Sequence, residues 1–371
     1  MSAKLKAQWK YDIASWKIDS PFERILGKLA DRSRIFRKVY VQYYKFHDPE
    51  YYYKGLSMIT DILSRNYIVG GGGVITDMIY SLHRFGCMFD EYFLFGFQAL
   101  NHEGRRTFVT DKTRYEYYAM MNSKEHKELF DDKKKAYDLF RKYYKRDLIF
   151  VKGEQDIDIF REFAEKHNNF LVKPYNSCCG RGVRMMRASD SNLDECFNEL
   201  LNLVGNGVVC EELIHQSSVM SEIHPQSVNT VRIPTIRTKN DVIIFHPFFR
   251  TGSGDSLVDN ASSGGIFSLP DPETGIIFTK GKTLKGDTFL KHPDSGIVFP
   301  GFRLPDWDEA VAMVKELAHV VSSERYIGWD LAHTDKGWIM VEGNASGDLK
   351  EAQCFSRTGV REELEKYIND I

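Results

Sequence analysis

Residues 326–346 read YIGWDLAHTDKGWIMVEGNAS, the most informative stretch of the chain. Apolar and polar residues alternate on both sides of Asp335-Lys336-Gly337, which predicts two antiparallel strands joined by a three-residue loop. Glycine stands where the loop backbone needs a positive φ. If the loop sets the register, Thr334 pairs with Trp338, and the more distant pairs follow by counting outward.

This counting places Asp330 opposite Glu342, with Asn344 two residues further along the same face. Opposed residues have Cβ atoms about 5 Å apart, so two carboxylates there repel each other unless a positive charge lies between them. Oxygen ligands without histidine or thiolate favour Mg²⁺, which keeps positions for water and nucleotide phosphates. The alternative, an exposed turn with ordinary acidic residues, is disfavoured by the neighbouring isoleucine, methionine and tryptophan.

The composition is that of a globular protein of two or three lobes, with 371 residues and a formal net charge of −2. So small a net charge gives no general attraction to nucleic acid, which argues against a dedicated nucleic-acid binder. Six cysteines without a CxxC pair, and an N-terminus without an apolar signal core, favour the cytoplasm. No apolar run approaches the roughly 20 residues that span a bilayer.

The N-terminal third is predicted to be helical, because apolar residues such as Phe22 and Leu29 recur at helical spacing over residues 21–66. The first 60 residues are also rich in aromatic and basic side chains. Either these helices pack on their own domain, which is the usual case, or they contact a membrane surface. A charged helix is predicted over residues 124–146, and short strands after Phe150.

A lysine-ended strand and a small-residue loop form a candidate phosphate site. FLVKP ends in Lys173 and Pro174, and NSCCGRGVRMMR follows as a flap over residues 176–187. Backbone N–H groups of such a loop can cup phosphate while the lysine supplies a point charge. A structural hairpin is the alternative. Further on, GVVCEELI carries Glu211 and Glu212, which either face solvent or meet an adenine ring.

The segment SVNTVRIPTIRTKNDVIIFHPFFRTG, residues 227–252, predicts another hairpin and carries Asn229, Arg232 and Arg250. The forked donors of arginine suit anion binding, and pairing with carboxylates is the structural alternative. The polar loop from Asp259-Asn260 to Gly265 could border a triphosphate or acceptor pocket.

From about Lys124 to the C-terminus the chain resembles the sugar-transfer-associated ATP-grasp family. The resemblance rests on the order of its motifs, since none of them is sufficient alone. In chain order they are FDDKKKAYDLF, FLVKP, SCCGRGV, VVCEELI, SVNTVRI, the arginine of FFRTG, DNASSGG, HPDSG, GWDL and VEGN.

The resemblance implies an α+β (α/β) ATP-grasp fold, in which two antiparallel-sheet-containing subdomains hold the nucleotide between them. The expected parts are a helical N-terminal lobe at residues 1–112, a lid subdomain with the flap and adenine hinge at 113–215, and a catalytic, metal-binding subdomain at 216–371.

The resemblance also assigns roles to individual residues. Lysines and the flap would bind phosphate, the hinge would bind adenine, and Arg250 would neutralise the γ-phosphate. The implied ATP contacts are Lys133, Lys173, Ser177, Gly180, Gly182, Glu211, Glu212, Leu213, Ile214 and Asn260. The implied catalytic side chains are Arg250, Arg232 and Asn229. The implied ligands of one or two magnesium ions are Asp330, Glu342 and Asn344.

Two positions depart from the family pattern. Many amide-forming ATP-grasp ligases have an arginine two residues before the first metal-binding aspartate, but here that position is Gly328, and Arg232 or Arg325 would have to substitute. The acid that binds ribose is also not evident, since Ser217 and Ser218 lie where it is expected, and Glu222 is the nearest candidate.

The function implied by the resemblance is an ADP-forming ligase that uses ATP and Mg²⁺ to activate a carboxylate as an acylphosphate for attack by an amine, in polysaccharide or cell-surface glycan biosynthesis. One alternative is a kinase that phosphorylates a sugar or polyol hydroxyl. Another is a nucleotide-binding, non-catalytic subunit of a glycan assembly system. The sequence identifies neither the acceptor, a small molecule or a glycan-linked group, nor the oligomeric state.

Overall fold

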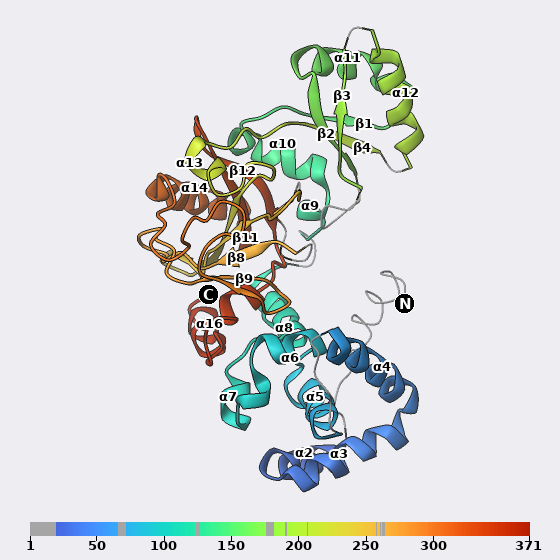
Figure 1. Ribbon diagram of the computed structural model, residues 1–371, viewed down its shortest axis with the longest axis vertical. Coiled ribbons are helices and arrows are strands. Elements are labelled where there is room, and N and C mark those ends of the chain that lie inside the picture. The colour runs from blue at the N-terminus through green and yellow to red at the C-terminus, as the bar shows by residue number, and fades with distance from the viewer. Residues whose placement is uncertain are drawn as a thin grey trace. The chain divides into compact units, whose positions relative to one another are not determined.

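The computed structural model describes residues 20–65, 72–123, 127–175, 182–189, 191–205, 207–256, 258–259, 261 and 264–371 (Figure 1). Contacts divide the chain into two compact units. One contains the described part of Met1–Met120 together with Asp348–Asp370, and the other contains Met121–Gly347 and Ile371. No helix in the described ranges is long and apolar enough to cross a membrane.

The N-terminal unit is built from helices around an aromatic core. Ser20 and Glu23 close a capping box at its first described helix. The C-terminal segment is anchored here, because the Gln353 side chain bonds both the N–H and the carbonyl of Val109 at 2.8 Å. Its helices are α2 (Pro21–Arg32), α3 (Arg34–His47), α4 (Pro49–Arg65), α5 (Gly72–Phe85), α6 (Phe89–Leu94), η1 (Phe97–Ala99), α7 (His102–Arg106), α8 (Asp111–Met121), α15 (Lys350–Gln353) and α16 (Arg361–Ile368).

The second unit contains a small antiparallel sheet with strand order β1-β4-β2-β3. Helices α11 (Ile157–Lys166) and α12 (Leu193–Leu203) bury one face of it, and a short 3-10 helix, η2 (Glu154–Asp156), precedes α11. The other face carries Lys173 and Glu211. The strands are β1 (Leu148–Val151), β2 (Asn169–Pro174), β3 (Arg184–Arg187) and β4 (Val208–Glu212).

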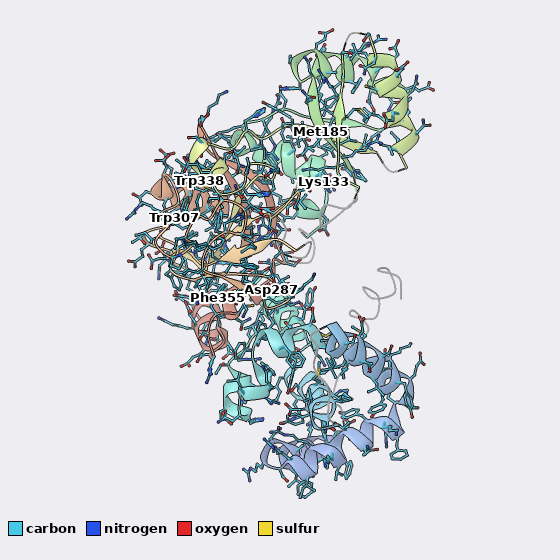
Figure 2. The ribbon with its side chains drawn as sticks, viewed as in Figure 1. Lys133, Met185, Asp287, Trp307, Trp338 and Phe355 are labelled. Carbon is cyan, nitrogen blue, oxygen red and sulfur yellow. The ribbon has the colours of Figure 1, made fainter. Side chains whose placement is uncertain are left out.

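The larger sheet of this unit has strand order β10-β9-β8-β7-β5-β11-β12, with β6 paired to β5. Helices α13 (Ser218–Ser221) and α14 (Trp307–Val320) contribute side chains to the core of this sheet. Trp307 and Trp338 belong to the same core (Figure 2). The strands are β5 (Thr230–Arg237), β6 (Val242–Ile244), β7 (Phe248–Thr251), β8 (Ile266–Ser268), β9 (Gly281–Lys282), β10 (Thr288–Phe289), β11 (Tyr326–Thr334) and β12 (Gly337–Asn344).

The predicted hairpin is present, but its turn differs from the prediction. Thr334 pairs with Gly337 and not with Trp338, so two residues form the turn. Gly337 has φ +85°, a conformation that glycine tolerates within a pair. A register shift then leaves Val341 unpaired, and beyond it Asp330 pairs with Glu342 as predicted.

The single charged helix predicted over residues 124–146 is wrong. The described chain forms two helices there, α9 (Lys127–Asp131) and α10 (Lys133–Tyr144). Asp132 separates them because its carboxylate accepts hydrogen bonds from the N–H groups of Lys134 and Lys135 and so caps α10. Lys133 therefore lies at the first turn of a helix.

Candidate functional site

Lys173 and Glu211 lie on the face of the small sheet that α11 and α12 leave open. Leu171 pairs with Glu211 on one side and with Met185 on the other, and Lys173 pairs with Val209. Alternation along each strand therefore places these side chains on one face. Met185 is 55% exposed there, so the charged pair adjoins an accessible apolar surface.

The charges on this face are matched. The Lys173 Nζ donates to Glu211 Oε2 at 2.7 Å, and an Arg146 nitrogen lies 3.7 Å from the same oxygen. Burial opposes the ionisation of Glu211, but Lys173, Arg146 and Lys133 outweigh it and lower its pKa. The Lys133 Nζ donates to the Tyr175 carbonyl at 3.0 Å. The structure thus brings Lys133, Lys173 and Glu211 together.

Arg146 was not among the predicted residues, yet it joins the two sheets. Its guanidinium contacts Glu211 of β4 and donates to the Met340 carbonyl at 2.5 Å and the Val341 carbonyl at 3.3 Å. Those carbonyls lie beside the register shift of the β11–β12 hairpin. The only sequence signal would have been an arginine before a strand, which is too common to select.

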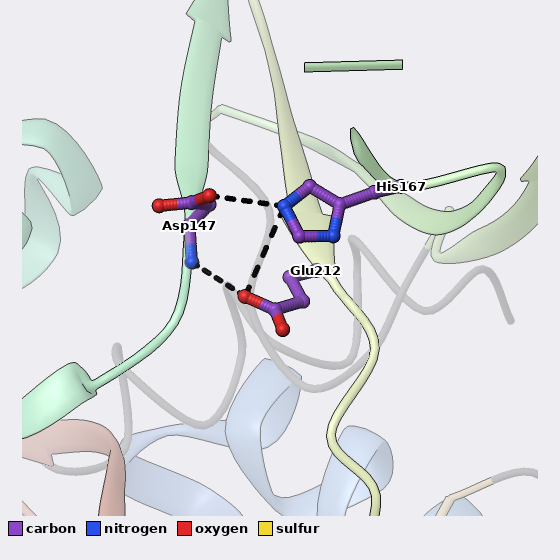
Figure 3. Close-up of side chains that lie close together, drawn as sticks. All are labelled: Asp147, His167 and Glu212. Carbon is purple, nitrogen blue, oxygen red and sulfur yellow. Dashed lines mark hydrogen bonds and ion pairs between the residues drawn. The ribbon is translucent and has the colours of Figure 1, made fainter. Parts of the chain in front are cut away.

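Glu212 ends β4, and Leu213 and Ile214, the other predicted adenine contacts, follow it. Glu212 belongs to a group with Asp147 and His167 whose ligand atoms lie within 4.8 Å of one another, close enough to hold a metal (Figure 3). These residues also bond each other: His167 Nε2 lies 3.0 Å from Asp147 Oδ2, and the Asp147 N–H donates to Glu212 Oε2 at 2.9 Å. The group therefore ties the start of β1 and the segment before β2 to the end of β4.

Three predicted ATP contacts, Ser177, Gly180 and Asn260, lie outside the described residues. Gly182, at the end of the flap, is described and has φ +73°. A Cβ atom there would lie 2.9 Å from the Pro174 ring, so both conformation and space favour glycine.

On the larger sheet, Asp330 is buried between Arg232 and Arg250, two arginines that were predicted from the sequence to be site residues. Arg232 donates through Nε and Nη2 to its two oxygens at 2.5 and 2.6 Å, and Arg250 Nη2 lies 2.8 Å from Oδ2. Burial opposes ionisation, but the two guanidiniums lower the Asp330 pKa to about 2. The positive charge expected beside this carboxylate is therefore supplied in part by the protein.

Arg250 is held in place by its own neighbours. Its Nε and Nη2 contact the Thr230 hydroxyl at 3.0 and 2.8 Å, and Asp259 lies 3.7 Å away. Thr230 in turn donates to Asp259. Burial disfavours the charged guanidinium, but Asp330 and Asp259 raise the Arg250 pKa. Arg250 is thus a fixed, permanently charged donor.

Glu342 differs from Asp330 in exposure, since 55% of its side chain is exposed. Asn344 Nδ2 donates to Glu342 Oε1 at 3.3 Å, and Arg232 lies 3.8 Å from that oxygen. Crowding by the surrounding protein, followed by the Asp330 carboxylate, raises the pKa of Glu342. The three predicted ligands therefore lie together, with Glu342 the accessible member.

The side chain of Arg232 lies beside Gly328. A Cβ atom built on Gly328 would lie 3.4 Å from Arg232 Cδ, so the stem of Arg232 covers this glycine. Of the two arginines considered as substitutes, Arg232 is the one beside Asp330. Arg325 instead donates to the Arg237 carbonyl at 3.4 Å.

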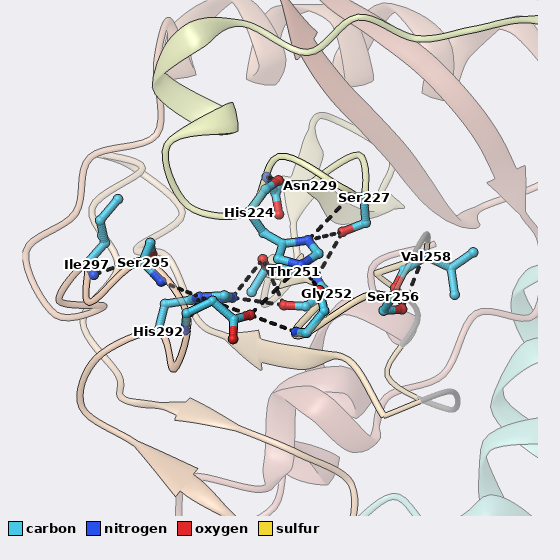
Figure 4. Close-up of polar contacts among 12 residues, drawn as sticks. His224, Ser227, Asn229, Thr251, Gly252, Ser256, Val258, His292, Ser295 and Ile297 are labelled. Carbon is cyan, nitrogen blue, oxygen red and sulfur yellow. Dashed lines mark hydrogen bonds and ion pairs between the residues drawn. The ribbon is translucent and has the colours of Figure 1, made fainter. Parts of the chain in front are cut away.

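Asn229 is buried in a polar cluster that precedes β5 (Figure 4). Its Nδ2 donates to the carbonyls of Met220 and His224 at 2.7 and 3.0 Å and to the Gln216 side chain. His292, also buried, lies 2.8 Å through Nε2 from the Gly252 carbonyl, in the loop after Arg250. These contacts show that Asn229 orders the loop. His224 and His292 were not predicted from the sequence, because a single histidine has no characteristic spacing to other ligand residues.

Comparison of the sequence with models of known protein families identifies the family of this chain. The model of the sugar-transfer associated ATP-grasp family matches residues 112–369, and the chain belongs to that family. The predicted fold class, antiparallel sheets with a helical N-terminal lobe, is confirmed. No curated protein matches the sequence.

Several solved ATP-grasp structures have similar folds. The ATP-grasp ligase PsnB complexed with minimal precursor is 13% identical, with 68% of this chain and 64% of that chain covered and a TM-score of 0.41. D-alanyl-alanine synthetase A from Vibrio cholerae is 9% identical, with 67% of each chain covered and a TM-score of 0.43. D-alanine-D-alanine ligase from Helicobacter pylori is 15% identical, with 68% and 64% covered and a TM-score of 0.39. The chain thus spans 64% of the PsnB chain, and these likenesses say nothing about its substrates.

Proposed function

We propose that this chain is an ADP-forming ligase that uses ATP and Mg²⁺ to activate a carboxylate for attack by an amine. The observation that carries the proposal is the cluster of Arg232, Arg250, Asp330 and Glu342 on one sheet. A second charged group, Lys133 and Lys173, supports nucleotide binding. Phosphoryl transfer depends on such positioning and charge neutralisation more than on a protein nucleophile.

The residues present fit a magnesium ion. A carboxylate has about four acceptor positions. Three hydrogen bonds or ion pairs occupy three of these positions on Asp330. Glu342 is accessible, and after desolvation by the surrounding protein the neighbouring Asp330 carboxylate also raises its pKa. We propose that Asp330, Glu342 and Asn344 hold Mg²⁺. When bound, it would neutralise phosphate charge and orient the triphosphate.

In the proposed reaction a substrate carboxylate oxygen attacks the γ-phosphorus of ATP, and the bond to the bridging oxygen breaks so that ADP leaves. Arg250 and Arg232 neutralise the charge on the transferred phosphoryl group. An amine then attacks the acyl carbon, phosphate leaves with its oxygen, and the amine loses a proton. Lys133 and Lys173 bind the phosphates, and residues 211–214 hold the adenine.

The description of the family supports a role for this ligation in polysaccharide or cell-surface glycan biosynthesis. We also propose that the protein acts in the cytoplasm. Four cysteines, Cys87, Cys196, Cys210 and Cys354, are free and buried, which suits a reducing compartment.

The test has two stages. Calorimetric titration with a non-hydrolysable ATP analogue, with and without Mg²⁺, should show magnesium-dependent binding that Glu342→Gln weakens. Turnover with pooled carboxylates and amines should then release ADP and phosphate in equal amounts with a new amide. ADP without free phosphate, together with a phosphorylated acceptor, would instead establish a kinase. Tight binding without any turnover would contradict an enzymatic role.

A further inference from the structure

Helices α2 and α3 form a hairpin whose outward side is apolar. Ser33 alone separates the two helices, and the rings of Phe22 and Tyr43 lie 5.4 Å apart, so the helices run antiparallel. Several large apolar side chains on the hairpin are strongly exposed, including Phe46 at 80% and Ile35 at 74%. The exposed set is Phe22, Ile25, Leu29, Ile35, Phe36, Val39 and Phe46.

These side chains do not belong to the inner surface of the hairpin. On α3, the buried residues Tyr40 and Tyr44 face the interior of the N-terminal unit, where Tyr40 contacts Tyr80 of α5. Ile35 and Phe46 lie at helical positions opposite these tyrosines. The hairpin therefore has two apolar faces, and only the inner one is used by the described fold. A helix that is apolar on both sides needs a second apolar partner.

The charges of the hairpin identify the partner. Residues 20–47 contain seven Lys or Arg and two acidic residues, a net charge of +5 in a chain whose net charge is −2. Both acids are engaged: Glu23 closes the capping box, and Asp31 pairs with Arg84 at 2.7 Å. Within the described residues, no ion pair is found for the exposed bases of the hairpin. These are Arg24, Lys28, Arg32, Arg34 and Lys38.

We propose that the α2–α3 hairpin docks this protein on an anionic lipid bilayer. Its apolar side chains would enter the boundary between headgroups and acyl chains, while the surrounding lysines and arginines would meet the lipid phosphates. A protein partner with an acidic rim would be a less economical match, because the exposed apolar residues lie along two adjacent helices and are accompanied by lysines and arginines, which is typical of helices that lie in a membrane interface. The proposal is independent of the ligase reaction.

The test is co-sedimentation of the full chain with vesicles of phosphatidylcholine containing about one-third phosphatidylglycerol, and with vesicles of phosphatidylcholine alone. We expect binding to the anionic vesicles that weakens as salt is added. The double variant Ile35→Ser/Phe46→Ser should bind at least about tenfold more weakly. Replacing Lys38 by Gln should weaken binding about fivefold. The hairpin variants should retain the wild-type circular dichroism spectrum and ATP turnover.

The matched control is Phe278→Ser, which removes a side chain of similar exposure, 60%, from the other unit and should bind like wild type. Failure of the wild-type chain to bind anionic vesicles would overturn the proposal. So would a dimer in sedimentation analysis that dissociates in Ile35→Ser/Phe46→Ser, because the apolar face would then pair with a second copy. Loss of binding in Trp9→Ser/Trp16→Ser but not in the hairpin variants would assign the contact to residues 1–19 and equally overturn it.

Discussion

Asp330 and Glu342, the two opposed carboxylates of the β11–β12 hairpin, should respond differently to loss of their charge. Asp330→Asn removes the counter-ion of two buried guanidiniums, whereas Glu342→Gln removes one of two neighbouring negative charges. We expect both variants to lose magnesium-dependent ATP turnover. Only Asp330→Asn should lose substantial stability, because Asp330 is buried in close ion pairs with Arg232 and Arg250, whereas Glu342 is exposed and lies 3.8 Å from Arg232.

The magnitude follows from the pKa of Asp330. Arg232 and Arg250 overcome the effect of burial and lower this pKa from its ordinary value of 3.8 to about 2. The lowering corresponds to about 2.5 kcal/mol in favour of the charged carboxylate. This contribution is complete above pH 3.8 and is lost as the pH falls towards 2, because the folded state binds its proton later than the unfolded chain.

Thermal denaturation at pH 7 provides the assay. For a folding unit of the size of Met121–Gly347, which contains Asp330, a loss of about 2.5 kcal/mol lowers the melting temperature by roughly 5–10 °C. Glu342→Gln should lie within about 2 °C of wild type, because a substitution of an exposed residue rarely changes stability by more than about 0.5 kcal/mol. Equal melting temperatures for the two variants, whether both high or both low, would refute the distinction between a buried ion pair and an accessible ligand.

Three further predictions concern other parts of the chain. Lys173→Met should raise the KM for ATP at least about tenfold and lower the melting temperature, since Glu211 loses its closest cation; an unchanged KM would remove Lys173 from the nucleotide site. Burial lowers the pKa of His83 to about 3, so the stability of the wild-type protein should fall as the pH falls below 6.5. In denaturant titrations, His83→Phe should therefore gain about 2 kcal/mol of stability relative to wild type between pH 7 and pH 5. Parallel pH profiles of the two proteins would contradict this prediction. Gly359→Ala should cost more than about 2 kcal/mol in the same titrations, because its Cβ would lie 2.3 Å from the backbone of Phe108, while Gly205→Ala, with open space around it, should be neutral.

The hairpin shows how far alternation along a strand predicts a site. The pairing of Asp330 with Glu342 was predicted from a three-residue loop, but the turn has two residues. The unpaired Val341 compensates for the difference. The unpaired residue keeps Met340 in the core and Glu342 on the site face. The burial of the apolar face therefore decides the strand register, and the length of the turn does not. Local sequence predicted which residues meet, and it could not predict the bulge.

The residues that neutralise Asp330 lay beyond local reasoning. Arg232 is opposite Asp330 because β5 pairs with β11, although 98 residues separate the two side chains along the chain. The order of strands in a sheet depends on packing across the whole unit, which alternation along one strand does not contain. The arginines were selected for their donor chemistry, and their shared partner emerged only from the strand order.

The internal partners of these cations also constrain how a nucleotide would bind at the proposed site. Lys173 is held by Glu211, Lys133 by the Tyr175 carbonyl, and Arg232 and Arg250 by Asp330. Each cation therefore has an internal partner, so binding exchanges one set of ion pairs for another and adds few new ones. A triphosphate that drew Arg250 away would leave Asp330 paired with Arg232 alone, and a divalent cation could then take the place of the Arg250 charge. If the proposed site is right, nucleotide and magnesium binding should therefore be coupled, because each would make the site more favourable for the other.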